Sequence, residues 1–335
     1  MITDKIRKQS EENEKLLLSP KACFSCETKG RMREEDKCPI RTDFQRDRDR
    51  IIHSKSFRRL KHKAQVFISP ENDHFRTRLT HSLEVFQVSV TIARALRLNE
   101  DLTGAIALGH DLGHTPFGHA GESTLNEIMK SYGLSFHHAL HSLKIVDKLE
   151  KDGKGLNLTF EVRDGIARHS KGNADLKNGN DLPMTLEGQI VRISDRIAYL
   201  NHDIDDAVSA GIISLGDIPS DICEALGNTT SKRIKNMIFD IVNASEELET
   251  IQLSQNMASI LNSLKDFMFE KVYYNEKKLL IEKLYKEKIK YLFEYYMIED
   301  KSERDEKEKA VDVADYISSM TDNYAQQEMK KLGIL

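Results

Sequence analysis

Apolar residues recur at intervals of three and four along most of the chain, the spacing of amphipathic helices. In the segment 80–96, for example, Leu83, Phe86 and Val90 fall on one face. The same spacing predicts further helices at 99–110, with Asn99 as the N-cap, and at 120–131, 138–150, 159–169, 185–210 and at several places after residue 219. We find neither an internal repeat nor a β-hairpin pattern in the sequence. The pattern therefore predicts an all-α fold.

Breaks in this pattern mark the connections. Residues 151–157 and 171–183 are rich in Gly, Asn and Asp and predict loops. The highly charged segment 299–310 predicts either a solvent-facing helix start or a connection between helices.

Composition excludes several classes of protein. The 335 residues are 31% charged and 39% hydrophobic, a balance typical of a folded, water-soluble chain. No apolar run approaches the roughly 18 residues that cross a bilayer, and the first twenty residues lack a signal-peptide core. We therefore expect a cytoplasmic protein with no membrane partner.

Four cysteines are too few for a disulfide scaffold in a chain of this length. Cys23, Cys26 and Cys38 could begin a zinc site, but no fourth ligand is obvious nearby. Ordinary reduced thiols are the expectation.

Charge matters locally rather than globally. The net charge is only −4, which implies no general attraction to nucleic acid. Between Arg41 and Lys63, however, nine Lys or Arg residues stand against three Asp residues. This stretch is either a solvated helix face or a surface that receives a polyphosphate or a nucleic-acid backbone. The only aromatic residues in or next to this stretch are Phe44, Phe57 and Phe67, fewer than a surface that stacks nucleic-acid bases would need.

Histidines gather in the middle of the chain, seven of the twelve between residues 81 and 141. The densest stretch is 110–122, with sequence HDLGHTPFGHAGE. Its glycines and proline predict a shaped loop rather than a continuous helix. Neutral imidazoles beside a carboxylate suit a divalent metal ion with coordination positions left open for water and substrate, as metal-assisted hydrolysis requires.

Two further groups of polar residues could contribute to the same chemistry. His119 and Glu122 are three residues apart, so they share a helix face and could act as an acid/base pair, or Glu122 could simply favour a helix N-terminus. Asp195, Tyr199 and Asp203 follow one another at four-residue steps along one helix face, which alone could be an ordinary surface.

These residues resemble a known family. The order His81, His110-Asp111, Asp195 is similar to the signature of HD-domain phosphohydrolases. Five blocks resemble the deoxyguanosinetriphosphate triphosphohydrolase-like branch of these enzymes more closely. They follow the family's order, span about half of the chain, and comprise residues 41–67, 76–85, 110–122, 161–172 and 195–207. The resemblance implies an HD-domain helical core at 41–215, preceded by an extension at 1–40 and followed by helices at 216–335 that pack on the core.

The resemblance also implies an activity, which is hydrolysis of deoxynucleoside triphosphates to deoxynucleoside and inorganic triphosphate by attack of water at the α-phosphorus. It assigns roles as follows: metal binding to His81, His110, Asp111 and Asp195; catalysis to His119 with Glu122, and to His114 at the α-phosphate; and substrate binding to Gln65, Arg78, His138, Tyr199 and Asp203. Arg78 and His138 would contact phosphate and the other three the deoxyribose. The metal could be Mn, Mg, Ni, Co, Fe or Zn, because two His and two Asp accept most of them.

Relatives often form homo-oligomers, including hexamers, and several are activated by a dNTP at a subunit interface, so both are expected here by analogy. Some relatives bind single-stranded DNA, and weak binding of that kind is a further expectation.

Two alternatives remain at this point. One is another HD phosphohydrolase, acting on a monophosphate, a cyclic dinucleotide or an alarmone. The other is a nucleic-acid-binding or nucleotide-sensing protein. The sequence assigns neither the preferred base nor the proton donor, which could be His114 or His119.

Overall fold

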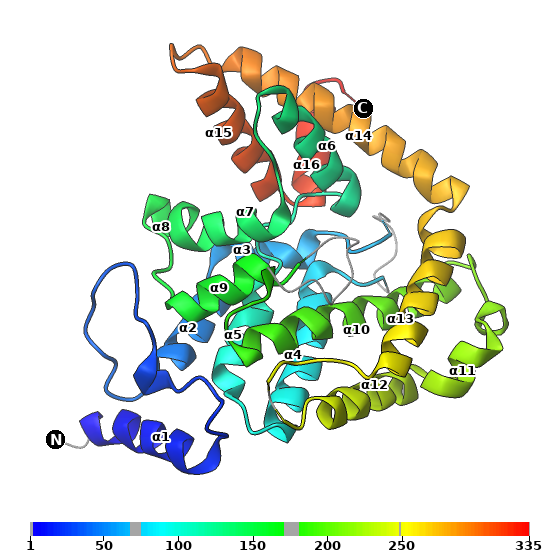
Figure 1. Cartoon of the computed structure of the whole chain (residues 1–335). Helices are drawn as coiled ribbons and strands as arrows, with labels where there is room; N and C mark the ends of the chain where they lie inside the picture. Colours follow the sequence, from blue (N-terminus) through cyan, green and yellow to red (C-terminus); the bar gives the residue numbers. More distant parts are fainter. Residues whose placement is uncertain (1–2, 68–74, 171–180, 248, 335) are drawn as a thin grey trace.

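The computed structural model describes residues 3–67, 75–170, 181–247 and 249–334 and is built from helices (Figure 1). In this part of the chain, β-structure is limited to two isolated bridges, Arg31–Thr159 and Ala64–Thr77. The expected all-α fold is confirmed. None of the described helices is both long and apolar enough to span a membrane.

The α-helices, in chain order, are α1 Thr3–Leu17, α2 Asp43–Ile52, α3 Lys55–Arg59, α4 Arg78–Ala95, α5 Glu100–Gly109, α6 Gly118–Ser131, α7 His138–Lys144, α8 Glu150–Gly153, α9 Phe160–Arg168, α10 Leu186–Ser209, α11 Ser220–Leu226, α12 Thr230–Ala244, α13 Gln255–Met268, α14 Glu276–Glu299, α15 Glu306–Ser319 and α16 Asp322–Lys331. Short 3₁₀ turns occur at η1 Ser25–Glu27, η2 Leu60–His62 and η5 Leu215–Asp217, and π-helical turns at η3 Ile145–Leu149 and η6 Phe269–Tyr273.

Local sequence signals account for several helix ends. The side chain of Asn99 accepts hydrogen bonds from two amides of α5, as expected for an N-cap, and α5 ends at Gly109. The charged segment 299–310 contains both the end of α14 and the start of α15. The predicted loop at 151–157 begins with the short helix α8, in which Lys151 and Asp152 have left-handed backbone angles. Of the predicted loop at 171–183, residues 171–180 lie outside the described residues.

Three apolar clusters form the core. One joins α2, α4, α5 and α9 through residues such as Phe44, Ile51 and Ile106. A second packs α4 and α10 against α11 to α13. The third lies between α6 and the last three helices, with Phe117 and Leu125 against Ile289 and Phe293. Helix α6 therefore belongs by packing to the upper part of the molecule, beside α14, α15 and α16 (Figure 1).

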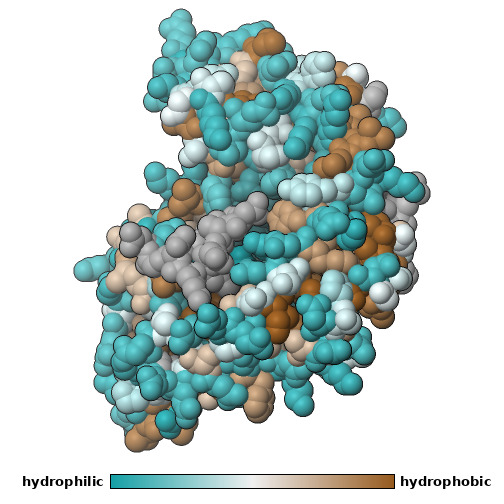
Figure 2. Space-filling view, turned by 45° about the vertical axis from the view of Figure 1, so that its right-hand side comes forward, coloured by the Kyte–Doolittle hydropathy of each residue, from teal (hydrophilic) through white to brown (hydrophobic). Residues whose placement is uncertain are grey.

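The two parts meet at a concave surface. The space-filling view shows a largely hydrophilic face that is hollowed where the upper part joins the rest of the molecule (Figure 2). The loop from His110 to Phe117, which we call the α5–α6 loop, crosses between these parts. Gly113 lies so close to α7 that an added Cβ would be 2.1 Å from the amide nitrogen of Ser142. Here the chain needs a residue without a side chain.

Candidate active site

Three predicted metal ligands from three different helices converge. His81 comes from α4, His110 follows the last residue of α5, and Asp195 comes from the middle of α10. His81 Nε2 lies 3.1 Å from Asp195 Oδ1 and 3.3 Å from His110 Nε2. This convergence follows from the fold, because α10 packs against both α4 and α5. The three side chains form a group that could hold a metal ion.

Hydrogen bonds behind the histidines turn their rings toward the centre. His110 Nδ1 lies 2.6 Å from the carbonyl oxygen of Ala107 and can donate to it, which leaves the Nε2 lone pair free. His81 Nδ1 lies 2.9 Å from His202 Nε2, so its Nε2 also faces Asp195. Support of this kind from the outer ring nitrogen is typical of metal-ligating imidazoles. The donor set therefore fits a divalent transition metal.

Asp111 lies at the edge of this cluster. Its Oδ1 is 3.8 Å from His110 Nε2, and its Oδ2 accepts a hydrogen bond of 2.7 Å from Arg78 Nη1. Burial by itself would raise the pKa of Asp111, but the positive charge of Arg78 outweighs it, and the pKa lies well below its usual value. Asp111 is thus held as a carboxylate, the form in which it could bind a cation.

A cavity of about 520 Å³ opens beside the cluster and contains the rest of the predicted site. Eleven of the twelve predicted residues line it: Gln65, Arg78, His81, Asp111, His114, His119, Glu122, His138, Asp195, Tyr199 and Asp203. The twelfth, His110, lies fully buried behind them. We call this cavity the catalytic cleft. The structure brings the predicted residues together without assigning their roles, which stay predictions.

The contacts of Glu122 differ from the pairing expected on the helix face. Its Oε1 accepts a hydrogen bond of 2.8 Å from the backbone amide of His138 and lies 2.8 Å from His138 Nδ1. Its Oε2 lies 3.7 Å from His114 Nε2. Within the described part of the chain, no hydrogen bond joins Glu122 to His119, whose side chain is exposed in the cleft. Glu122 thus directly orients His138 rather than His119.

The same contacts set the charges of these groups. Burial would lower the pKa of His138, but the facing Glu122 carboxylate raises it above the ordinary value. Burial lowers the pKa of His114 well below its ordinary value, helped by the nearby charges of Arg78 and His138. The Nδ1 atom of His114 is buried with no hydrogen-bond partner among the described residues. The pKa values of these two neighbouring imidazoles are therefore shifted in opposite directions.

Asp203, a predicted deoxyribose contact, lies deeper than a surface residue would. Its Oδ2 accepts a hydrogen bond of 2.6 Å from the hydroxyl of Tyr273, and its Oδ1 lies 2.7 Å from His202 Nδ1. Tyr199 lies one turn earlier on the same face of α10 and also lines the cleft. The polar face of α10 is therefore an inner wall of the cleft and not a surface.

Sequence reasoning missed several residues of this cleft. His169 lies with Nε2 3.2 Å from His138 Nε2, and its place in the 161–172 block was the signal that could have found it. His202 supports His81 from behind. Tyr273 and the paired Lys278 and Glu282 reach the cleft from the C-terminal helices, which carry no local motif.

The cysteines give no support to a zinc site. All four thiols are free, and no cysteine of the described chain joins a group of possible metal ligands. Cys23 is largely buried, which raises the pKa of its thiol, and Cys26 is exposed. The expectation of reduced thiols is consistent with this arrangement.

Comparison with known families agrees with this centre. Residues 78–200 match the HD domain, and residues 251–331 match the phosphohydrolase-associated domain. With the His–Asp cluster, these matches define an HD-domain phosphohydrolase.

More closely related proteins narrow the assignment. A deoxyguanosinetriphosphate triphosphohydrolase-like protein of Caldanaerobacter subterraneus is 52% identical and covers 98% of this chain and 96% of its own length. Proteins of the same name from Desulfatibacillum aliphaticivorans and Clostridium tetani are 46% and 45% identical over 98% and 95% of this chain and 97% and 93% of their own. The chain belongs to the deoxyguanosinetriphosphate triphosphohydrolase-like family.

A solved structure supports the fold. The crystal structure of a hypothetical protein from Aquifex aeolicus superposes with a TM-score of 0.52 at 20% identity, over 85% of this chain and 68% of that chain.

Proposed function

We propose that the protein hydrolyses deoxynucleoside triphosphates to deoxynucleoside and inorganic triphosphate. The observation that carries the proposal is the cleft itself, in which a metal-binding cluster, a buried arginine and a group of histidines face one cavity of about 520 Å³. A triphosphate carries about four negative charges, so its binding requires concentrated positive charge. The names of the relatives, which specify deoxyguanosine triphosphate, support this substrate class.

Each group would have a distinct task. A divalent cation held by His81, His110, Asp111 and Asp195 would supply Lewis acidity to the α-phosphate and to the attacking water. Arg78 donates to Asp111 through Nη1 and also lines the cleft, so we assign its guanidinium group to a phosphate oxygen as well. Arg78 would therefore join the metal centre to the substrate.

The leaving group needs a proton. Water attacks the α-phosphorus and the bond to the nucleoside 5′-oxygen breaks, which leaves an alkoxide that a nearby acid must protonate. We assign this role to His119, because its side chain is exposed to the cleft, whereas His114 is buried. Burial lowers the pKa of both imidazoles, and that of His114 lies well below its ordinary value. His114 and His138, both beside Glu122, would instead contact the phosphate oxygens.

A deoxyribose subsite would complete the cleft. Gln65, Tyr199 and Asp203 line it together and offer an amide, a phenol and a carboxylate to the 3′-hydroxyl. Tyr199 would pack where a ribose 2′-hydroxyl would lie, and so would favour the deoxy substrate.

Product analysis tests the proposal. Each dNTP is incubated singly with the protein and Mn²⁺ or Mg²⁺, and the phosphates are separated by ion exchange. Intact triphosphate with free deoxynucleoside is the expected result. Release of orthophosphate or pyrophosphate would point to another HD phosphohydrolase activity, and no hydrolysis of any dNTP would reject the assignment.

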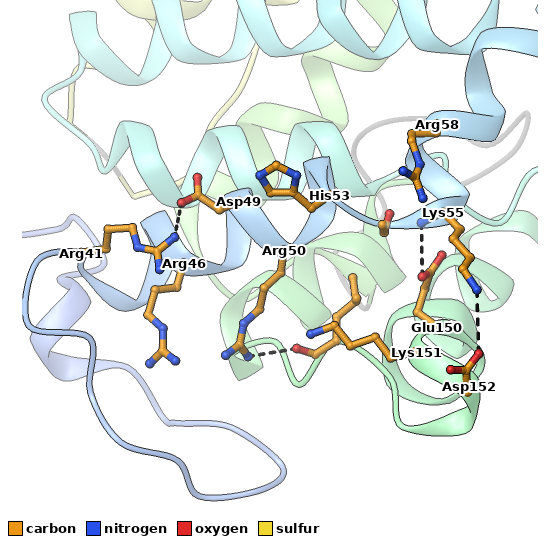
Figure 3. A pocket seen from close by; sticks show the side chains of 12 residues that line it. Arg41, Arg46, Asp49, Arg50, His53, Lys55, Arg58, Glu150, Lys151 and Asp152 are labelled. Atoms are coloured by element: carbon orange, nitrogen blue, oxygen red, sulfur yellow. Dashed lines mark hydrogen bonds and ion pairs between the residues drawn. The ribbon is translucent and has the colours of Figure 1, made fainter.

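A second cavity supports the expectation of nucleotide activation. About 490 Å³ in volume, it lies between α2, α3 and α8 and is lined by six Lys or Arg against three acidic residues (Figure 3). Several of the cations are already paired, such as Arg41 with Asp49 at 2.6 Å. Arg58 and Lys151 form no ion pair with any residue that the structure describes. We propose that this basic cleft receives the phosphates of an activating dNTP.

Assembly and nucleic-acid binding belong to the same proposal. An activator at a subunit interface requires a homo-oligomer, which light scattering after size exclusion would measure with and without dNTPs. If single-stranded DNA binds to the basic cleft, its affinity should fall steeply as the salt concentration rises. A rate that appears only when dNTPs are mixed would identify the nucleotide as the activator.

A further inference from the structure

The C-terminal helices are tied to the α5–α6 loop by one buried carboxylate. Asp322, the first residue of α16, accepts a hydrogen bond of 2.9 Å from the amide of Phe117 through Oδ1. Through Oδ2 it accepts a second, of 2.8 Å, from the amide of Ala64. The residue is only 8% exposed. Asp322 therefore joins the two segments that carry His114 and Gln65 into the catalytic cleft.

A buried lysine forms a second connection between the α5–α6 loop and the C-terminal helices, in which the side chain donates hydrogen bonds instead of accepting them. Lys63 is 2% exposed, and its Nζ donates to the backbone carbonyl oxygens of His114 and, at 2.7 Å, Ser318. Ser318 lies in α15, while His114 lies in the α5–α6 loop. One side-chain nitrogen thus holds a carbonyl group from each part of the molecule.

The loop needs this support because its last residue has a strained backbone. Phe117 has φ 59° and ψ 27°, the left-handed region that residues with a Cβ rarely adopt. Its ring stacks on Tyr285 of α14, with centroids 4.2 Å apart and planes 20° apart. Such a conformation persists only where the surroundings enforce it. At Phe117 that surrounding is the C-terminal part of the chain.

We propose that Asp322 and Lys63 are positioning residues through which the C-terminal helices hold the α5–α6 loop in its left-handed turn, with His114 and His119 aimed at the substrate. His114 lies within the loop, and His119 is the second residue of α6, two positions after Phe117. If the turn at Phe117 relaxes, both side chains move, while His81 and Asp195 stay on their helices and His110 stays at the other end of the loop, next to α5. The catalytic part of this inference rests on the proposed function.

The test substitutes Asp322 in the full-length chain. Asp322→Asn keeps the shape but leaves only one oxygen to accept, so one of the two amides loses its partner. A misplacement of this kind is expected to lower kcat by about tenfold to a hundredfold. The affinity for Mn²⁺, measured by calorimetry, stays within about twofold, because His81 and Asp195 lie on α4 and α10, and His110 and Asp111 lie at the far end of the loop from Phe117.

Hydrogen exchange followed by mass spectrometry gives a readout that needs no activity. In Asp322→Asn, amides of residues 64–66 and 114–118 exchange at least about ten times faster, while α4 and α10 keep their protection. Asp312→Asn is the matched control, because Asp312 is 56% exposed and, among the residues that the structure describes, forms an ion pair with Arg304 alone, at the surface. It leaves both kcat and exchange unchanged.

Three outcomes overturn the proposal: wild-type kcat in folded Asp322→Asn, unchanged protection of the loop, or a loss of protection spread evenly over the chain, which would mark a purely structural role. Should Asp322→Asn fail to fold, Lys63→Met carries the same measurements from the other side of the contact. If the wild-type protein hydrolyses no dNTP, the proposed function fails, yet the exchange experiment still decides whether the C-terminal helices hold the loop.

Discussion

The catalytic cleft and the basic cleft are similar in volume but differ in how their polar groups are held. In the catalytic cleft, His110 and Asp111 are almost fully buried, and each has a specific partner, Ala107 and Arg78. In the basic cleft, Lys55 and Asp152 are 63% and 93% exposed and lie 3.8 Å apart. Buried polar groups without partners are costly, whereas exposed ion pairs contribute little. Substitutions should therefore have large effects in the first cleft and small effects in the second.

The largest expected effect is at His110. His110→Ala removes a fully buried Nε2 from the cluster, so metal retention and hydrolysis should both fall below detection while the helical circular dichroism stays. Metal content after dialysis and the initial rate measure this. His53→Ala, an exposed histidine of the basic cleft, is the matched control and should retain metal and basal rate. Full activity in His110→Ala would remove the metal assignment.

The next effect in size is at His119. His119→Ala should bind metal like the wild type but lower kcat by about 10²–10⁴, the usual contribution of a general acid or base. Steady-state kinetics beside metal analysis separate the two properties. A wild-type rate in this variant, together with a large loss in His114→Ala, would transfer the proton donor role to His114.

Glu122→Gln should have a smaller effect with a characteristic pH dependence. Burial lowers and the Glu122 carboxylate raises the pKa of His138, and the net pKa is above the ordinary value. Without the carboxylate that pKa falls, so His138 loses its proton at lower pH. The alkaline limb of the rate profile should then shift to lower pH, with kcat reduced about tenfold to a hundredfold at neutral pH. An unmoved limb would show that the charge of His138 does not limit the rate.

The sequence predicted correctly those features that depend on the spacing of neighbouring residues. The helix periods and the Asn99 cap are short-range features, and the fold confirms them. The spacing of Asp195, Tyr199 and Asp203 put them on one helix face, which the structure turns into a cleft wall. The bond from Glu122 to His138 could not be predicted this way, because it depends on how α6 and α7 meet.

Contacts between segments far apart in the chain could not be predicted from the sequence either. Tyr273 meets Asp203 across seventy residues, and Asp322 meets Ala64 across more than two hundred and fifty. Neither residue lies in a motif, and each takes its place only when the C-terminal helices pack on the core. Likewise, a count of charges between 41 and 63 could not reveal that Arg50 is already bound to Glu35 at 2.6 Å.

A change in selectivity, rather than in rate, is expected at Tyr199. Tyr199→Ala opens space where a ribose 2′-hydroxyl would lie, so the ratio of kcat/KM for dGTP over GTP should fall by about tenfold, the scale of one lost steric contact in a pocket. Tyr199→Phe keeps the ring and should keep most of the discrimination. Unchanged selectivity in Tyr199→Ala would reject Tyr199 as the residue that excludes ribonucleotides.

The smallest effect is expected in the basic cleft, where it sharpens the comparison most directly. Lys151 lines the basic cleft, is exposed, and has no ion-pair partner among the described residues. Lys151→Gln should leave the rate with a single dNTP unchanged and weaken activation by a second dNTP severalfold, because one phosphate contact of a screened, exposed cation is lost. Lys148→Gln, outside the lining of this cleft, is the control. If Lys151→Gln lowers the basal rate as much as the activated rate, the two clefts are not independent, and the basic cleft serves the catalytic substrate itself.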